Sequence, residues 1–126
     1  MSYEYVIDSY AWVEYFRGSE KGAKAKEFIE SGKAATSSVT IAELSEKYER
    51  ESKEFEEDFN FIILQTKIVN LDMGLARKSG KINFENKKII KNWGMADSII
   101  LAAANLFGAR VVTGDEHFRN LNSIMI

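Results

Sequence analysis

The sequence of 126 residues contains no cysteine, no proline and a single histidine, His117. The absence of cysteine excludes disulfide bonds, thiolate metal sites and cysteine nucleophiles. One histidine cannot build a zinc site by itself, and we expect His117 to lie exposed in a turn. Because proline is missing, glycine and asparagine are the residues that interrupt the helical patterns. The ends of the predicted helices are therefore defined only to within several residues.

Long apolar runs are missing as well. The longest nearly apolar run, residues 98–107, is too short to span a bilayer and includes Asn105. Residues 1–8 have neither the basic segment nor the apolar segment of a secretory signal. We therefore expect a cytoplasmic protein without a membrane partner. The length suits a single domain over residues 1–126, and an apolar fraction of 45% is typical of a globular protein.

The net charge is only −2, but the charges are unevenly distributed. Residues 43–58 contain eight acids and three bases, whereas residues 77–91 contain six bases and one acid. Such segregation predicts either an anionic ligand on the basic side or two solvated helix faces. Composition alone does not choose between these alternatives.

Alternating patterns divide the chain into strands and helices. Short apolar runs predict strands at residues 5–7, 34–37, 68–71, 110–113 and 123–126. Amphipathic spacing predicts helices at residues 10–16, 20–30, 39–48, 53–65, 72–79 and 97–107, with an irregular stretch at 81–95. This alternation favours a parallel sheet covered by helices on both faces. We therefore predict an α/β fold with three layers, α/β/α, around a mainly parallel sheet of four or five short strands.

Three of four candidate acids occupy the starts of predicted helices or turns. Asp8 and Asp115 follow two of the predicted strands, and Asp97 opens the long apolar helix. Each acid has an ordinary explanation as a helix cap or a first-turn charge. Glu43 lies three residues after Thr40, which is the spacing of a capping box.

The four acids together indicate a metal site. In an open parallel sheet, ligands bind beyond the carboxyl ends of the strands, where the strand order reverses. If the strands that precede Asp8 and Asp115 are neighbours, their carboxylates lie close enough to share an ion. Carboxylates crowded at one edge repel one another unless a divalent cation compensates. Oxygen ligands suit Mg²⁺ or Mn²⁺ rather than zinc.

Four segments that contain these acids resemble the PIN domain family and, within it, the VapC-like ribonuclease toxins of toxin–antitoxin systems. The segments are residues 5–12, 38–44, 96–104 and 112–118, and their likeness extends over almost the whole chain. The resemblance implies a metal-dependent endoribonuclease in which Asp8, Glu43, Asp97 and Asp115 are the catalytic, metal-binding acids. It implies that the hydroxyls of Ser9 and Thr113 orient the carboxylates.

The resemblance also implies an RNA substrate, a small antitoxin partner and a homodimer. Basic residues are candidates to contact the RNA, namely Arg17, Lys78, Lys81, Lys87, Lys88 and Lys91. Large side chains of the first two helices either line an antitoxin groove or belong to the core, namely Tyr10, Trp12, Phe16, Phe28 and Ile29.

The sequence alone leaves two alternatives to a toxin. One is a PIN-like module that is non-catalytic, with acids that serve only as caps, or that processes RNA. The other is a flavodoxin-like phosphotransfer domain. A dehalogenase-type phosphatase of this kind needs a second aspartate two residues after the first, but the residue two positions after Asp8 is Tyr10.

Overall fold

The computed structural model describes residues 2–126 and confirms the predicted fold class. The strands are β1 (Tyr5–Ile7), β2 (Ala34–Ser37), β3 (Lys67–Val69), β4 (Arg110–Thr113) and β5 (Ser123–Met125). The helices are α1 (Ser9–Arg17), α2 (Glu20–Ile29), α3 (Ser38–Arg50), α4 (Glu56–Gln65), α5 (Met73–Asn86) and α6 (Met95–Phe107). A short 3₁₀ helix, η1 (Glu116–Phe118), connects the last two strands.

The strands form one parallel sheet in the order β3-β2-β1-β4-β5. β1 is the central strand and pairs with β2 on one side and β4 on the other. The chain therefore moves outward from β1 in one direction and later returns to its other side, so the order reverses between β1 and β4. A flavodoxin-like sheet has the order 2-1-3-4-5, which this sheet does not have. The phosphotransfer alternative thus loses its architectural basis.

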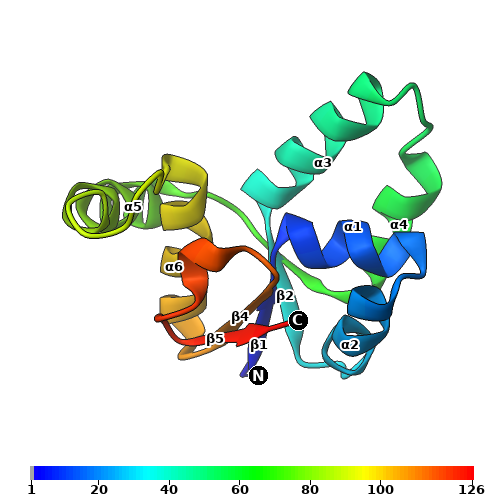
Figure 1. The fold of residues 1–126 in the computed structure, drawn as a ribbon, viewed down its shortest axis with the longest axis horizontal. Coiled ribbons are helices and arrows are strands. Elements are labelled where there is room, and N and C mark those ends of the chain that lie inside the picture. The colour runs from blue at the N-terminus through cyan, green and yellow to red at the C-terminus, as the bar shows by residue number, and fades with distance from the viewer. Residues whose placement is uncertain (1) are drawn as a thin grey trace.

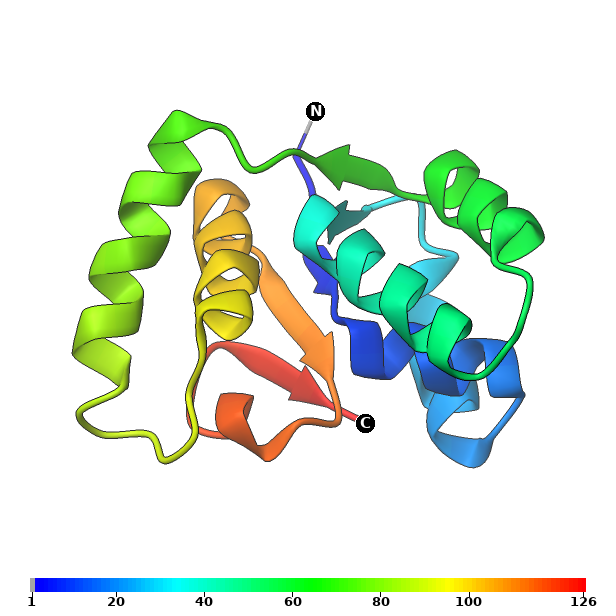
Figure 2. The ribbon, with the colours of Figure 1, turned by 90° about the horizontal axis from the view of Figure 1, so that it is seen from above.

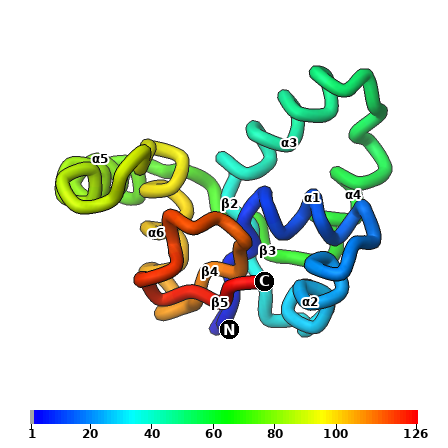
Figure 3. The backbone as a smooth tube through the Cα atoms, in the orientation of Figure 1, coloured from blue at the N-terminus to red at the C-terminus, as the bar shows by residue number. Residues whose placement is uncertain are grey.

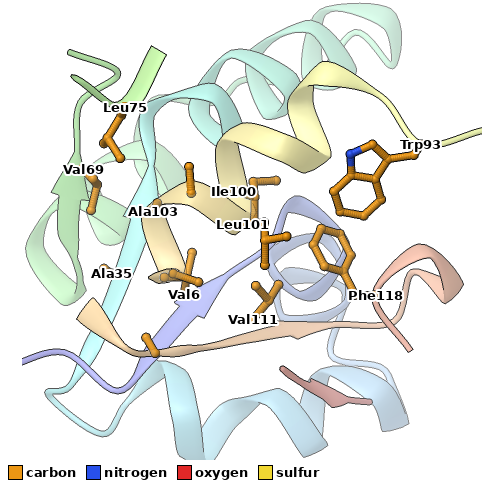
Figure 4. Close-up of a cluster of buried hydrophobic side chains, with 13 residues drawn as sticks. Val6, Ala35, Val69, Leu75, Trp93, Ile100, Leu101, Ala103, Val111 and Phe118 are labelled. Atoms are coloured by element: carbon orange, nitrogen blue, oxygen red, sulfur yellow. The ribbon is translucent and has the colours of Figure 1, made fainter. Parts of the chain in front are cut away.

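Successive residues of the strands point to opposite faces of the sheet, and helices cover both faces. Val6 and Val111 belong to a core that packs against α5 and α6, whereas Ile7 and Val112 belong to a core that packs against α1, α2, α3 and α4. Figures 1 and 2 show these two groups of helices on either side of the sheet. Figure 4 shows the first core, where Trp93 and Phe118 close the end nearest to η1. This burial on both faces is what a parallel sheet requires.

Helix α5 is longer than the sequence predicts. The predicted helix ends at Ser79 with Gly80 as its stop, but α5 continues to Asn86, and the stretch predicted as irregular is helical in its first part. Leu75, Ser79 and Ile82 recur at helical spacing and face the core shared with α6. Glycine inside a helix costs about 1 kcal/mol relative to alanine, and packing against α6 outweighs that cost.

The helices that matter for the site begin at one edge of the sheet. Figure 3 shows α1 and α3 starting at the carboxyl ends of β1 and β2, close to the turn that follows β4. Asp8 is the N-cap of α1, Ser37 is the N-cap of α3, and Asp115 is the N-cap of η1. The topology therefore collects helix starts, with their unpaired backbone N–H groups, at the carboxyl edge.

Candidate metal centre

Asp8 and Asp115 come together because β1 and β4 are hydrogen-bonded neighbours. Ile7 pairs with Val112, and the Asp8 N–H continues the ladder by donating to the Val112 carbonyl at 3.1 Å. Gly114 lies between β4 and Asp115, and a Cβ there would be 2.2 Å from the Tyr10 ring. Glycine at this position therefore lets Tyr10 of α1 pack against the turn that carries Asp115.

The Asp8 carboxylate is buried and held at both oxygens. Its Oδ1 accepts the Ser9 N–H at 2.7 Å, and its Oδ2 accepts the Thr113 hydroxyl at 2.7 Å. Burial, with smaller contributions from the negative charges of Asp115 and Asp97, raises the pKa of Asp8 to about 6 despite these two hydrogen bonds. An ionised Asp8 is thus costly in this environment unless a positive charge lies close to it.

Glu43 does not have the capping role that its spacing from Thr40 suggests. Helix α3 begins at Ser38 and its N-cap is Ser37, so Glu43 lies beyond the first turn. Among the described residues, Glu43 Oε1 is buried without a hydrogen-bond partner. Burial raises the pKa of Glu43 to about 7, and the charge of Asp8 is the next largest cause. A buried polar atom without a partner calls for a ligand or an ion.

The third acid, Asp97, meets Asp115 through His117. Asp97 Oδ2 accepts the Gly94 N–H at 3.1 Å, which closes a capping box at the start of α6, and lies 3.0 Å from His117 Nδ1. Asp115 Oδ1 accepts the His117 backbone N–H at 2.9 Å. The prediction that His117 is an exposed turn residue is wrong, because its side chain is only 27% exposed and lies between two acids.

All four acids line one cleft of about 440 Å³, which we call the acidic cleft. Its walls come from α1 and α3, and it is closed at one end by the starts of α6 and η1. The residues that line it are Asp8, Ser9, Tyr10, Val13, Glu14, Arg17, Glu43, Leu44, Glu46, Lys47, Arg50, Asp97 and Asp115. The topology therefore brings residues from the first half and the last quarter of the chain into one concave surface.

The donor set of the acidic cleft fits a hard divalent cation. Carboxylate oxygens of Asp97 and Asp115 lie within 4.8 Å of each other, beside His117, and Glu43 adds the buried oxygen that has no partner among residues 2–126. Carboxylate oxygens are the ligands that Mg²⁺ and Mn²⁺ prefer. Burial is the main cause of the raised pKa values of Asp8 and Glu43, and the charges of neighbouring acids add to it, so a bound divalent cation would favour the ionised forms of both groups.

Of the six basic residues predicted to contact RNA, one lines the acidic cleft. Arg17 lines it, together with Lys47 and Arg50, which sequence reasoning missed. Lys47 and Arg50 follow Glu43 by four and seven residues, so helical spacing places them on the same face of α3. Within the described chain, the predicted lysines of α5 and of the turn after it are not among the lining residues, namely Lys78, Lys81, Lys87, Lys88 and Lys91.

No helix in the range 2–126 is long and apolar enough to cross a membrane.

No curated protein matches the sequence. A family model described as the PIN domain matches residues 5–123.

Several solved structures share the fold. A toxin–antitoxin complex from Klebsiella pneumoniae matches with a TM-score of 0.77 and 20% identity, covering 97% of this chain and 97% of that chain. The VapC20 toxin of Mycobacterium tuberculosis, described as cleaving the sarcin–ricin loop, matches with a TM-score of 0.75 and 13% identity, covering 98% of both chains. DNA-bound VapBC from Salmonella typhimurium matches with a TM-score of 0.68 and 20% identity, covering 98% of this chain and 96% of that chain. At these identities the likeness establishes the fold.

Proposed function

This chain belongs to the PIN domain family, and from that premise we propose that it is a divalent-metal-dependent endoribonuclease and the toxin of a toxin–antitoxin pair. In this proposal residues 1–126 act as one domain. The site is the acidic cleft, with Asp8, Glu43, Asp97 and Asp115 as its catalytic, metal-binding acids.

The observation that carries the proposal is the environment of Glu43. Three of the acids have structural roles, since Asp8 caps α1, Asp97 closes the capping box of α6 and Asp115 caps η1. A non-catalytic module that keeps its acids only as caps would account for those three. It does not account for Glu43, which caps nothing and has a buried oxygen without a partner among the described residues. A metal site accounts for all four acids.

Each of the four acids has a separate role in the proposed site. Asp8 and Asp97 are the principal ligands of one or two Mg²⁺ or Mn²⁺ ions. Glu43 ligates directly or through water, and Asp115 completes the site or orients the attacking water. When bound, the metal lowers the pKa of a water molecule and neutralises charge on the phosphoryl oxygens.

Hydrogen-bond donors fix the orientation of the Asp8 carboxylate. Thr113 does so through its hydroxyl, at 2.7 Å. Ser9 does so mainly through its backbone N–H, at 2.7 Å, because its hydroxyl lies 3.5 Å from the same carboxylate. Both donors favour the ionised form of Asp8, which is the form that binds a metal.

The basic wall of the acidic cleft supports RNA as the substrate. We define this wall as Arg17, Lys47 and Arg50, which lie about one to two and a half turns along α1 and α3 from Asp8 and Glu43. Each is paired with an acid of its own helix or its end, at 2.7 to 3.4 Å. Exposed ion pairs of this kind contribute little, so these cations can pair with phosphates at small cost. The solved toxin that is described as cleaving the sarcin–ricin loop, an RNA element, supports the same substrate class.

An antitoxin partner and a homodimer belong to the same proposal. Structures with this fold include complexes described as toxin–antitoxin or VapBC. Met73 and Phe84 are 89% and 68% exposed, and Ile89 in the turn after α5 is 79% exposed. Met73 and Phe84 are three helical turns apart on one face of α5. Exposed apolar side chains of this size support a protein–protein contact on that face.

The large side chains of α1 and α2, for which groove and core were the alternatives, divide between the two. Trp12 and Ile29 are fully buried and belong to the core between the sheet and α1 to α4. Phe28 packs on Tyr5 in the same core. Tyr10 lines the acidic cleft, and Phe16 lines a second cavity of about 360 Å³ between α1, α3 and α4. A partner that occupies these cavities would therefore contact Tyr10 and Phe16, and would not reach Trp12 or Ile29.

The direct test is cleavage of single-stranded RNA by the purified protein. We expect cleavage with Mg²⁺ or Mn²⁺, no cleavage with EDTA, and loss of cleavage in Asp8→Asn and Asp97→Asn. Glu54→Gln is the matched control, because it removes an exposed acid that does not line the acidic cleft. Cleavage that survives both aspartate substitutions would remove the proposed mechanism.

A further inference from the structure

His117 contacts two of the four acids at once. Its Nδ1 lies 3.0 Å from Asp97 Oδ2 and 3.6 Å from Asp115 Oδ1. Its backbone N–H donates to the same Asp115 oxygen at 2.9 Å. Asp97 opens α6 and Asp115 follows β4, so these acids come from different elements. His117 is thus the residue through which the side chains of the two acids are connected.

The imidazole is held in place by its surroundings. The Trp93 ring lies 6.3 Å from the His117 ring, centroid to centroid, and 5.3 Å from the Phe118 ring. Trp93 is only 2% exposed, and its indole N–H donates to the Ser98 hydroxyl at 2.7 Å. The Ser98 hydroxyl also donates to Asn83 Oδ1 of α5 at 3.1 Å, so Trp93 is connected to α5 through Ser98. A fixed aromatic support of this kind limits the rotamers available to His117.

We propose that His117 is a positioning residue that aligns Asp97 and Asp115 for the metal through its Nδ1–H and its backbone N–H. This inference rests on the proposed metal site, although not on RNA as the substrate. Each acid uses one oxygen to accept from His117, namely Asp97 Oδ2 and Asp115 Oδ1. The other oxygen of each acid is then left for an ion. A donor held against a ligating carboxylate fixes the direction in which its remaining oxygen points.

The geometry favours positioning over direct ligation through Nδ1, the ring nitrogen that faces Asp97. A nitrogen 3.0 Å from a carboxylate oxygen is at hydrogen-bond distance, and an ionised carboxylate can only accept. His117 Nδ1 therefore carries a hydrogen, and a protonated ring nitrogen has no lone pair for a metal. The same hydrogen serves the alignment of Asp97.

The single histidine makes the first test simple, because any imidazole signal comes from His117. We expect ¹⁵N-detected spectra of the metal-free protein, recorded at mildly alkaline pH, to show the hydrogen on Nδ1. The signal should keep this tautomer when Mg²⁺ is added. An Nδ1 without a hydrogen, or a ring nitrogen that takes the shift of a metal-bound nitrogen, would overturn the proposal.

The second test measures metal affinity by calorimetry, with Mg²⁺ and Mn²⁺ titrated separately. His117→Ala should weaken the affinity for both ions by about 10- to 100-fold, the usual effect of losing a residue that orients ligands. His117→Asn, which keeps an N–H donor close to the position of Nδ1, should restore most of it. Glu116→Gln is the matched control, because Glu116 is an exposed neighbour in the same turn and pairs with Arg119. Its affinity should equal that of the unmodified protein.

The outcomes separate the possible roles of His117. A direct ligand would make His117→Ala lose far more affinity for Mn²⁺ than for Mg²⁺, because nitrogen ligands favour Mn²⁺ over Mg²⁺. Unchanged affinities in His117→Ala would mean that the residue only packs, and both results contradict the proposal. If His117→Ala fails to fold, His117→Asn and His117→Gln decide, since Gln moves its donor by one methylene and should not restore alignment. Tight, His117-dependent metal binding without RNA cleavage would contradict the proposed function alone.

Discussion

The Thr113 hydroxyl donates to Asp8 Oδ2 at 2.7 Å, although the two residues are 105 positions apart in the sequence. They meet because Thr113 ends β4 and Asp8 follows β1, its parallel neighbour. The same hydroxyl oxygen accepts the Asp115 N–H at 2.9 Å. One buried side chain therefore fixes both Asp8 and the turn that carries Asp115.

Thr113→Val should weaken metal binding while the fold is kept. Valine has the shape of threonine but removes the hydrogen bond that favours the ionised form of Asp8. We expect the affinity for Mn²⁺ to decrease by about 10- to 100-fold, measured by calorimetry. Thr113→Ser keeps the hydroxyl and should restore most of the affinity. Equal affinities in the valine and serine variants would contradict the orienting role of Thr113.

The metal-free protein should lose stability as the pH rises from about 4 to above 7. Burial raises the pKa of Asp8 from 3.8 to about 6 and that of Glu43 from 4.5 to about 7. The folded state therefore binds these protons more tightly than the unfolded state, and their contribution is fully present below the unfolded values. It is lost as each carboxyl ionises in the folded protein, at a cost on the order of 3 kcal/mol for Asp8 and, because Glu43 is partly exposed, on the order of 1 to 2 kcal/mol for Glu43.

The measurement is the free energy of urea unfolding as a function of pH, with and without Mg²⁺. Excess Mg²⁺ should reverse the trend, because it binds the ionised carboxylates of the folded state. A metal-free stability that stays constant between pH 4 and 8 would mean that the two acids do not have raised pKa values.

Glu43→Gln should stabilise the metal-free protein and abolish its proposed activity. The substitution removes a buried charge close to Asp8 and keeps the shape of the side chain. At pH 8 we expect a gain on the order of 1 to 2 kcal/mol in the free energy of unfolding, together with weaker metal binding. Glu46→Gln is the control, because Glu46 lies on the same helix with its side chain 75% exposed. If Glu43→Gln and Glu46→Gln behave alike, Glu43 has no special role.

Removal of the basic wall should reduce the salt dependence of RNA binding. Arg17→Gln, Lys47→Gln and Arg50→Gln each remove one proposed phosphate contact. Each should lower the slope of log K against log salt by about 0.7. Binding is measured in an Asp97→Asn background, which does not cut RNA under the proposal. Lys87→Gln tests a lysine outside the acidic cleft, and Lys24→Gln on α2 is the control for charge alone. A larger effect for Lys87 than for Arg50 would place the RNA on α5 instead.

The local sequence pattern was sufficient to predict the fold class, because strands buried on both faces have an apolar sequence signature that does not depend on their neighbours. The runs at Tyr5–Ile7 and Arg110–Thr113 predicted β1 and β4, and Gly108 ended α6 as expected, with a φ of +62°. The pattern failed at Gly80, where a local helix breaker was overridden by packing of α5 on α6. A single sequence contains no direct signal for that packing.

The sequence by itself determined the identity of the four acids and the placement of Asp8, Asp97 and Asp115 at the ends of strands and the starts of helices, because those positions follow from local propensity. Only the tertiary structure decided what surrounds them. The pairing of β1 with β4 gave Asp8 its contact with Thr113, and the meeting of α6 with η1 placed His117 between Asp97 and Asp115. Contacts between residues distant in sequence depend on strand order and helix packing, which local periodicity does not specify.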